Sequence, residues 1–147
     1  PQIVAKTVVL GVGNILLSDE GFGVRVAEAL SQRFRFPDAV EVLDGGTLGI
    51  ELMRFLDGAQ RLILIDAIHG SEPGSFRIIQ GDDVRLYFQE KVSLHEMGIQ
   101  EIVVIGVVPQ SLEIGLDLTP LVASRIDEAT DSVIRQLHDW GLECTAR

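Results

Sequence analysis

The sequence predicts an α/β protein of three layers, in which helices cover both faces of a mostly parallel, twisted sheet of about five strands. Apolar runs alternate with amphipathic stretches along the chain, which is typical of strands that are buried on both faces and separated by covering helices. The chain has 147 residues, of which 46% are hydrophobic and 23% are charged. These values indicate one globular domain, residues 1–147, with a substantial core.

Five short apolar runs are the expected strands. They lie at residues 7–12, 40–44, 62–66, 76–80 and 102–107. The fourth run is bounded by Pro73, Gly74 and Gly81, and such turn residues favour a short edge strand.

Helical periodicity predicts the covering helices. The first helix is expected at residues 21–33, where apolar side chains recur on one face. A short helix is expected near residues 83–89. The last helix has the clearest signals, because Thr119 can cap it, Pro120 suits its first turn and Gly141 can end it.

Composition argues against several classes of partner. With 22 acidic and 12 basic side chains, the formal charge of −10 repels nucleic acid phosphates and anionic lipid headgroups. The apolar runs are far shorter than the ~20 residues of a membrane span. We therefore expect no nucleic acid partner and no membrane insertion. A single cysteine, Cys144, and the lack of secretory signal features favour a cytoplasmic protein.

Carboxylates follow two strands of the expected sheet. Asp19 and Glu20 lie in the loop after the first strand, and Asp66 ends the third. In open α/β sheets, ligands bind at the carboxyl ends of strands where the strand order reverses. If the order is 2-1-3, Glu20 and Asp66 can converge on one site. Asp19 and Glu20 can instead serve only the helix start, whereas a carboxylate at the rim of a buried sheet needs a cation or hydrogen-bond donors.

Histidine is the other candidate ligand type, and it is scarce. His138 on the last helix is interpreted as surface. His69 follows Asp66 by three residues, and His95 lies in a loop-like segment, so both remain candidates. Two carboxylates and one imidazole suit a divalent transition metal with open positions, which can support hydrolysis. Neither a Gly-x-Ser-x-Gly elbow nor a His-Glu-x-x-His motif is present.

The glycines after the first strand have two interpretations. Gly11 and Gly13 begin a dinucleotide fingerprint, but its third glycine would fall at Leu16. We favour a tight loop whose backbone approaches another group. Residues 44–47 likewise have two interpretations. They form a turn and a helix cap, or they line the crevice at the carboxyl ends of the strands.

Seven short motifs follow one another along nearly the whole chain. They are residues 11–23 (GVGNILLSDEGFG), 43–47 (LDGGT), 66–68 (DAI), 73–74 (PG), 93–98 (SLHEMG), 106–109 (GVVP) and 115–120 (GLDLTP). Together they resemble the hydrogenase maturation proteases. These endopeptidases remove a short C-terminal extension from the large subunit of nickel-iron hydrogenases after nickel insertion. The resemblance implies this activity, the large-subunit precursor as partner, and nickel as cofactor or as a ligand that the substrate carries.

The resemblance also implies roles for individual residues. Glu20, Asp66 and His95 match the metal-contacting positions, which selects His95 over His69. In one implied mechanism a metal activates water or the carbonyl while Asp19 or Asp44 moves protons. In the other, the metal only docks the substrate and carboxylates perform the cleavage.

Substrate contacts are expected beside these carboxylates. The residues are Gly13, Asn14, Gly45 and Thr47. The sequence departs from the family in one place, because only residues 98–101 join Met97 to the last expected strand, where the family usually has a further helical stretch. The alternative function is a non-catalytic nickel-binding or docking protein for hydrogenase assembly that uses the same residues.

Overall fold

The computed structural model describes residues 5–47, 56–88 and 98–147. Five strands form its main sheet, in the order β3-β1-β4-β6-β5. Their bounds are β1 (Lys6–Val12), β3 (Val40–Gly46), β4 (Ala59–Ala67), β5 (Phe76–Gln80) and β6 (Glu101–Val107). All pairings are parallel except that of β5 with β6. The five expected strands and the edge position of Phe76–Gln80 are therefore confirmed.

The central strands are apolar throughout because both faces of the sheet are covered. Val9 and Ile63 face one cluster of buried side chains, whereas Val8 and Leu62 face another on the opposite side. Consecutive residues of one strand therefore enter different cores, as the pleat of a strand requires. This two-sided burial explains why β1 and β4 have continuous apolar runs instead of alternating ones.

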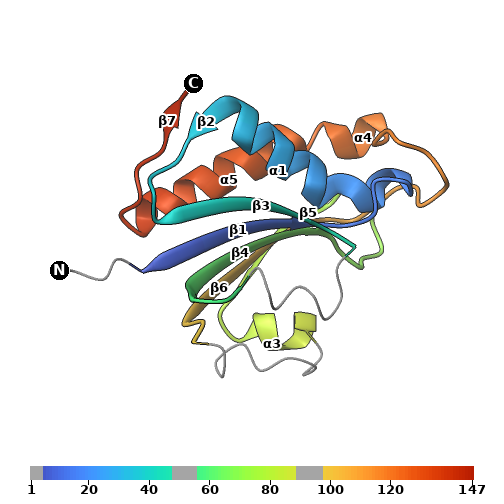
Figure 1. Ribbon diagram of the computed structural model, residues 1–147. Helices are drawn as coiled ribbons and strands as arrows, with labels where there is room; N and C mark the ends of the chain where they lie inside the picture. The colour runs from blue at the N-terminus through green and yellow to red at the C-terminus, as the bar shows by residue number, and fades with distance from the viewer. Residues whose placement is uncertain (1–4, 48–55, 89–97) are drawn as a thin grey trace.

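Helices cover both faces (Figure 1). On one face lie α1 (Phe22–Arg33), α4 (Pro120–Ala123) and α5 (Ile126–Asp139), and on the other lies α3 (Asp83–Phe88). Val26 and Leu30 of α1 and Val133 and Leu137 of α5 belong to the first cluster, and Val84 of α3 belongs to the second. The predicted three-layer architecture is confirmed.

The first helix was expected at residues 21–33, and α1 confirms it; a 3-10 turn, η1 (Ser18–Gly21), precedes it. The last helix differs from the expectation. The expected last helix consists of two helices, α4 and α5. Thr119 caps α4 by accepting a hydrogen bond from the Val122 amide, as predicted. The helix is interrupted where the Arg125 side chain donates a hydrogen bond to the Gly74 carbonyl at 2.9 Å, a contact that the local sequence does not encode.

A second small sheet was not expected. β2 (Phe34–Arg35) pairs antiparallel with β7 (Thr145–Ala146), and it fastens the end of the chain to the end of α1. Strands of two residues have no periodicity that a sequence can reveal. No helix in the described ranges is long and apolar enough to cross a membrane.

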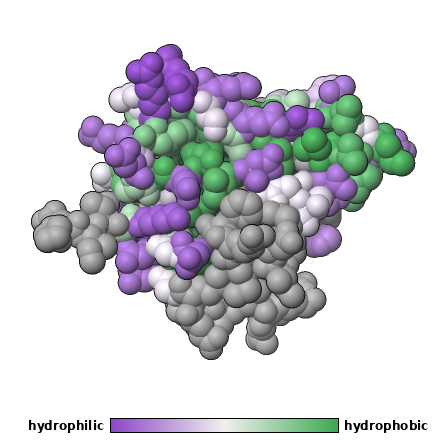
Figure 2. Space-filling model, in the orientation of Figure 1, coloured by the Kyte–Doolittle hydropathy of each residue, from purple (hydrophilic) through white to green (hydrophobic). Residues whose placement is uncertain are grey.

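The strand order places a reversal point beside β1. β3 and β4 pair with opposite edges of β1. Strands are therefore added on one side of β1 first and then on the other, as in a 2-1-3 order. The carboxyl ends of these parallel strands lie at one end of the molecule, next to η1 and α4 (Figure 1). On the face shown in Figure 2, hydrophobic residues reach the surface at the same end.

Candidate active site

A glycine-rich segment packs η1 directly against the sheet. Gly13 has φ +135°, a conformation that favours glycine, and a Cβ atom there would collide with the carbonyl of Glu20. A Cβ atom at Gly23 would likewise collide with the carbonyl of Ile65 in β4. The chain after β1 therefore lies against the end of β4, where Asp66 stands. A Cβ atom at Gly11 would collide with the carbonyl of Gly23, so the interpretation of Gly11 and Gly13 as a tight loop with close backbone approaches is confirmed.

Asp66 is half-buried at the end of β4 and both of its oxygens accept hydrogen bonds. The Ala67 amide donates to Oδ1 at 2.8 Å, and the Tyr87 hydroxyl of α3 donates to Oδ2 at 2.5 Å. Burial raises the pKa of Asp66 to about 6, although the two hydrogen bonds lower it. Burial of the Tyr87 side chain and the adjacent Asp66 charge raise the pKa of Tyr87, so its hydroxyl stays protonated and donates the hydrogen bond.

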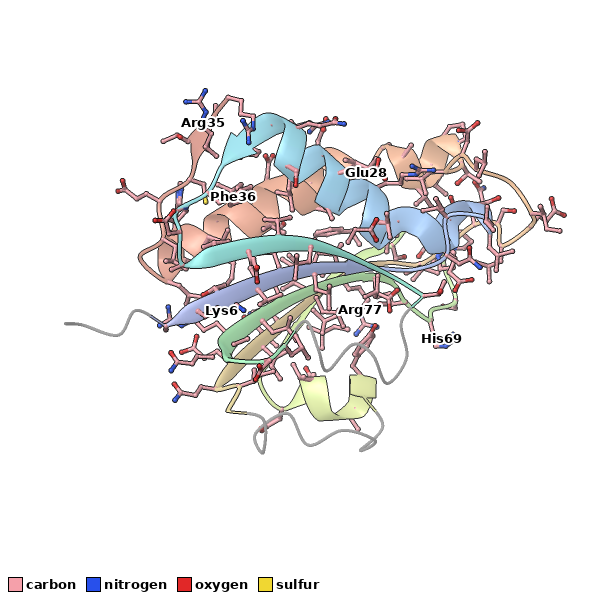
Figure 3. The ribbon with its side chains drawn as sticks, viewed as in Figure 1. Lys6, Glu28, Arg35, Phe36, His69 and Arg77 are labelled. Carbon is pink, nitrogen blue, oxygen red and sulfur yellow. The ribbon has the colours of Figure 1, made fainter. Side chains whose placement is uncertain are left out.

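Two further charges act on Asp66. The negative charge of Glu20 raises its pKa and the nearby His69 lowers it. Glu20 is therefore near enough for its charge to act on Asp66, and η1, which carries Glu20, packs against β4. That the two carboxylates share one site stays a prediction. His69 is exposed, and Figure 3 shows it at the end of the sheet where β4 finishes.

The carboxylate pair has the chemistry of a cation site. A desolvated carboxylate beside a like charge is relieved by a proton or by a cation. Carboxylate oxygens are ligands for divalent metals, so Glu20 and Asp66 fit such an ion. Among residues 5–47, 56–88 and 98–147, no three His, Cys, Asp or Glu side chains are grouped as a complete metal site. His95, the third expected ligand, lies outside these residues.

Asp19 has a different environment from its neighbour Glu20. Its side chain is 0% exposed. Its oxygens accept hydrogen bonds from the amides of Gln110, Ser111 and Thr119 at 2.7 to 3.0 Å, and from the Thr119 hydroxyl. It makes no cap on η1 or α1, so the helix-cap interpretation is wrong for this residue. The carboxylate instead fixes the loop of residues 109–119 against the start of η1.

Asp44 lies at the opposite edge of β1 from Asp66. Its side chain is exposed, and its Oδ1 accepts a hydrogen bond from the Gly46 amide at 2.9 Å. The register between β1 and β3 shifts at this point, so that Gly11 pairs with Asp44 but Val12 pairs with Gly46. Gly45 is the extra residue of this irregularity, and it is buried.

The remaining expected substrate contacts line the same end of the sheet. The Gly13 amide donates to the Gly46 carbonyl at 2.8 Å, and Asn14 Oδ1 accepts from the Leu16 amide at 2.9 Å. These polar groups therefore hold the loop itself. Thr47 is exposed at the end of β3.

Comparison with known proteins identifies the family. Residues 24–136 match the family model described as hydrogenase maturation protease. The chain belongs to the hydrogenase maturation protease family. It is accordingly a hydrolase of the endopeptidase type, as the motifs predicted.

Relatives of this protease match over nearly its whole length. The Hydrogenase 2 maturation protease of Escherichia coli (strain K12) is 39% identical over 158 residues, covering 97% of this chain and 96% of the relative. The hydrogenase expression/formation protein HupD of Bradyrhizobium diazoefficiens is 41% identical and covers 97% and 83%. The structure of the E. coli hydrogenase maturating endopeptidase HybD superposes with a TM-score of 0.86 at 39% identity, covering 97% and 98%.

The length of the first alignment bears on the shortened segment after His95. It runs over 158 positions, more than the 147 residues of this protease. The relative therefore contains residues that have no counterpart here. The described residues agree with a short connection, because β6 begins at Glu101, three residues after Gly98.

One residue of the site was not identified from the sequence. Tyr87 lies in α3, which follows β5 in the chain, and its hydroxyl donates a hydrogen bond to Asp66. A lone tyrosine in a short helix is ordinarily a packing residue, and no local signal distinguishes it.

Proposed function

We propose that this protease removes the C-terminal extension of a nickel-iron hydrogenase large-subunit precursor after nickel has been inserted. We further propose Glu20, Asp66 and His95 as the residues that contact nickel, which the precursor itself can supply. Family membership supports the reaction. The single observation that supports the site is the packing of η1, which carries Glu20, against the end of β4, where Asp66 is half-buried.

The residues of the chain have distinct roles in this proposal. When bound, nickel would polarise the scissile carbonyl or hold the substrate in place. Tyr87 and the Ala67 amide hold the Asp66 carboxylate in one orientation. Of the two carboxylates expected to move protons, Asp44 is exposed, whereas the oxygens of Asp19 are sealed and engaged. We therefore assign proton transfer to Asp44 and a positioning role to Asp19.

The substrate chain is proposed to lie across the ends of β1 and β3. Gly13, Asn14, Gly45 and Thr47 stand there. Gly13 and Gly45 shape the backbone beside Asp44, and Asn14 holds the turn that leads into η1. We propose the cytoplasm as the compartment, since a single cysteine suits a reducing environment.

Intact-mass analysis of the precursor tests the proposal. Purified protease is incubated with nickel-loaded and nickel-free precursor, and we expect the extension to be lost only from the loaded form. Asp66→Asn and Glu20→Gln should abolish processing, while Asp139→Asn and Glu143→Gln, which change exposed acids near the end of the chain, should leave it intact. Binding of loaded precursor without a change of mass would instead support the docking-protein alternative.

A further inference from the structure

Four large aliphatic side chains are exposed together beside the active site. Two neighbouring loops carry them, and their exposed fractions are 57% for Leu16, 54% for Leu112, 92% for Ile114 and 59% for Leu116. We call these four residues the loop patch. Figure 2 shows hydrophobic residues gathered at this end of the molecule, where Figure 1 places the loop that precedes α4. Exposed aliphatic residues that are clustered in this way commonly mark an interaction surface.

The two loops that carry the patch are fixed to each other. The Gly115 amide donates to the Leu16 carbonyl and the Ser18 amide to the Gly115 carbonyl, both at 2.9 Å. The Ser18 hydroxyl donates to the Glu113 carbonyl at 2.6 Å. The buried carboxylate of Asp19 adds its bonds to the same loop. The patch is thus held in place before any partner arrives, which lowers the entropic cost of binding.

The patch lies close in the chain to Glu20 of the carboxylate pair. Leu16 belongs to the turn that leads into η1, and Glu20 is in η1 only four residues later. A protein that covers the patch therefore reaches the end of the sheet where Glu20 and Asp66 converge.

The charges around the patch select the kind of partner. Glu113 and Asp117 are exposed between and beside its aliphatic residues. Arg25 contacts this loop, but it is engaged with the Leu116 carbonyl and with Glu28. In a two-fold dimer the patch would face itself, which would bring these acids against like charges. A partner with an apolar segment flanked by lysine or arginine fits better.

We infer that the loop patch docks the protein substrate through an apolar segment flanked by basic side chains. The inference rests on the proposed function, because it identifies the occupant as the precursor that the carboxylate pair acts on. The patch then supplies affinity, and the carboxylates at the sheet end supply the chemistry.

A matched pair of substitutions tests the inference. Ile114→Thr removes apolar surface from the patch, whereas Ile78→Thr makes the same change at an isoleucine of β5 that is 47% exposed. Processing of nickel-loaded precursor gives KM and kcat, and interferometry with immobilised precursor gives Kd. We expect Ile114→Thr to raise KM and Kd about tenfold with kcat within about twofold of wild type, and Ile78→Thr to change none of them. Leu112→Ser provides a second variant of the patch.

The possible outcomes are distinguishable. If wild type, Ile114→Thr and Leu112→Ser all process the precursor and bind it with equal Kd values, the inference is overturned. A wild-type dimer in sedimentation that becomes a monomer in Ile114→Thr would also overturn it, because a second copy would then cover the patch. If wild type binds the precursor without cleaving it, the proposed function fails, and the Kd comparison still decides whether the patch docks the precursor.

Discussion

At the scale of single residues, Asp66 has an environment that suits the cation proposed to bind there. Two hydrogen bonds fix its oxygens, yet burial still raises its pKa to about 6. An ionised Asp66 in the metal-free protein is therefore less stable than the same group in the unfolded chain. Such destabilised groups are typical of functional sites, where a ligand relieves the strain.

The first prediction concerns Asp66→Asn in the metal-free protein. The pKa of Asp66 is raised on folding from 3.8 to about 6. The stability that this group contributes is therefore complete below about pH 4 and is lost as the pH rises through about 6. Asparagine stays neutral, its Oδ1 can accept from the Ala67 amide, and its NH₂ group can donate to the Tyr87 hydroxyl oxygen in place of the bond that this hydroxyl donates to Asp66. We expect the variant to be about 2 kcal/mol more stable than wild type near pH 8 and equal to it near pH 4.

Urea unfolding at the two pH values measures this difference. Asp139→Asn is the control, since it changes an exposed acid in α5 and should leave the stability difference between the two pH values unaltered. A stability gain for Asp66→Asn that is the same at both pH values would contradict the assigned cause, because it would not depend on ionisation.

At the scale of elements, the strands could be predicted from the sequence, whereas the hydrogen bonds between segments far apart in the chain could not. β1 and β4 are apolar because both faces are buried, a property that local sequence records. At the interruption between α4 and α5, Arg125 donates a hydrogen bond to Gly74, which is far away in the chain. The role of Asp19 is hidden for the same reason, because its partners lie about 90 to 100 residues away.

The candidate site likewise has parts that the sequence predicts and parts that it does not. The proximity of Glu20 and Asp66 was predicted on the condition that the strand order is 2-1-3, and the structure has that order. Tyr87 was missed because no periodicity connects α3 with the end of β4. The choice of His95 over His69 came from motif resemblance, and it stays a prediction because residue 95 lies outside the described ranges.

The second prediction follows from the environment of Asp19. Asp19→Asn replaces one acceptor oxygen by an NH₂ group that faces amide donors of Gln110 and Ser111. Leaving these buried amide donors without an acceptor lowers the free energy of unfolding by about 3 kcal/mol. We expect this loss in urea unfolding, together with faster amide exchange in residues 109–119.

The matched control is Asp117→Asn, which makes the same chemical change at an exposed position of the same loop. We expect this control to unfold within about 0.5 kcal/mol of wild type. Wild-type stability in Asp19→Asn would show that the carboxylate does not fasten the loop. Processing that is lost without any loss of stability would instead return Asp19 to the set of proton-transfer candidates.

At the scale of the whole molecule, charge and shape act together at one end. The formal charge of −10 creates a field that attracts a basic partner from a distance. The carboxyl ends of the parallel strands, the carboxylate pair and the loop patch all lie at the same end of the sheet. A protein substrate can therefore be steered by charge, held by apolar contact and cleaved without leaving that end.

The last prediction is that salt slows processing through association. Because the acidic surface steers a basic partner, kcat/KM for loaded precursor should fall about tenfold between roughly 50 and 500 mM NaCl, while kcat at saturating precursor should stay within about twofold. Glu113→Gln, which removes a charge between the aliphatic residues of the loop patch, should flatten this dependence, whereas Glu143→Gln near the chain end should not. A kcat/KM that is insensitive to salt would show that long-range charge has no part in bringing the substrate to this end. The apolar loop patch would then have to provide recognition by short-range contact alone.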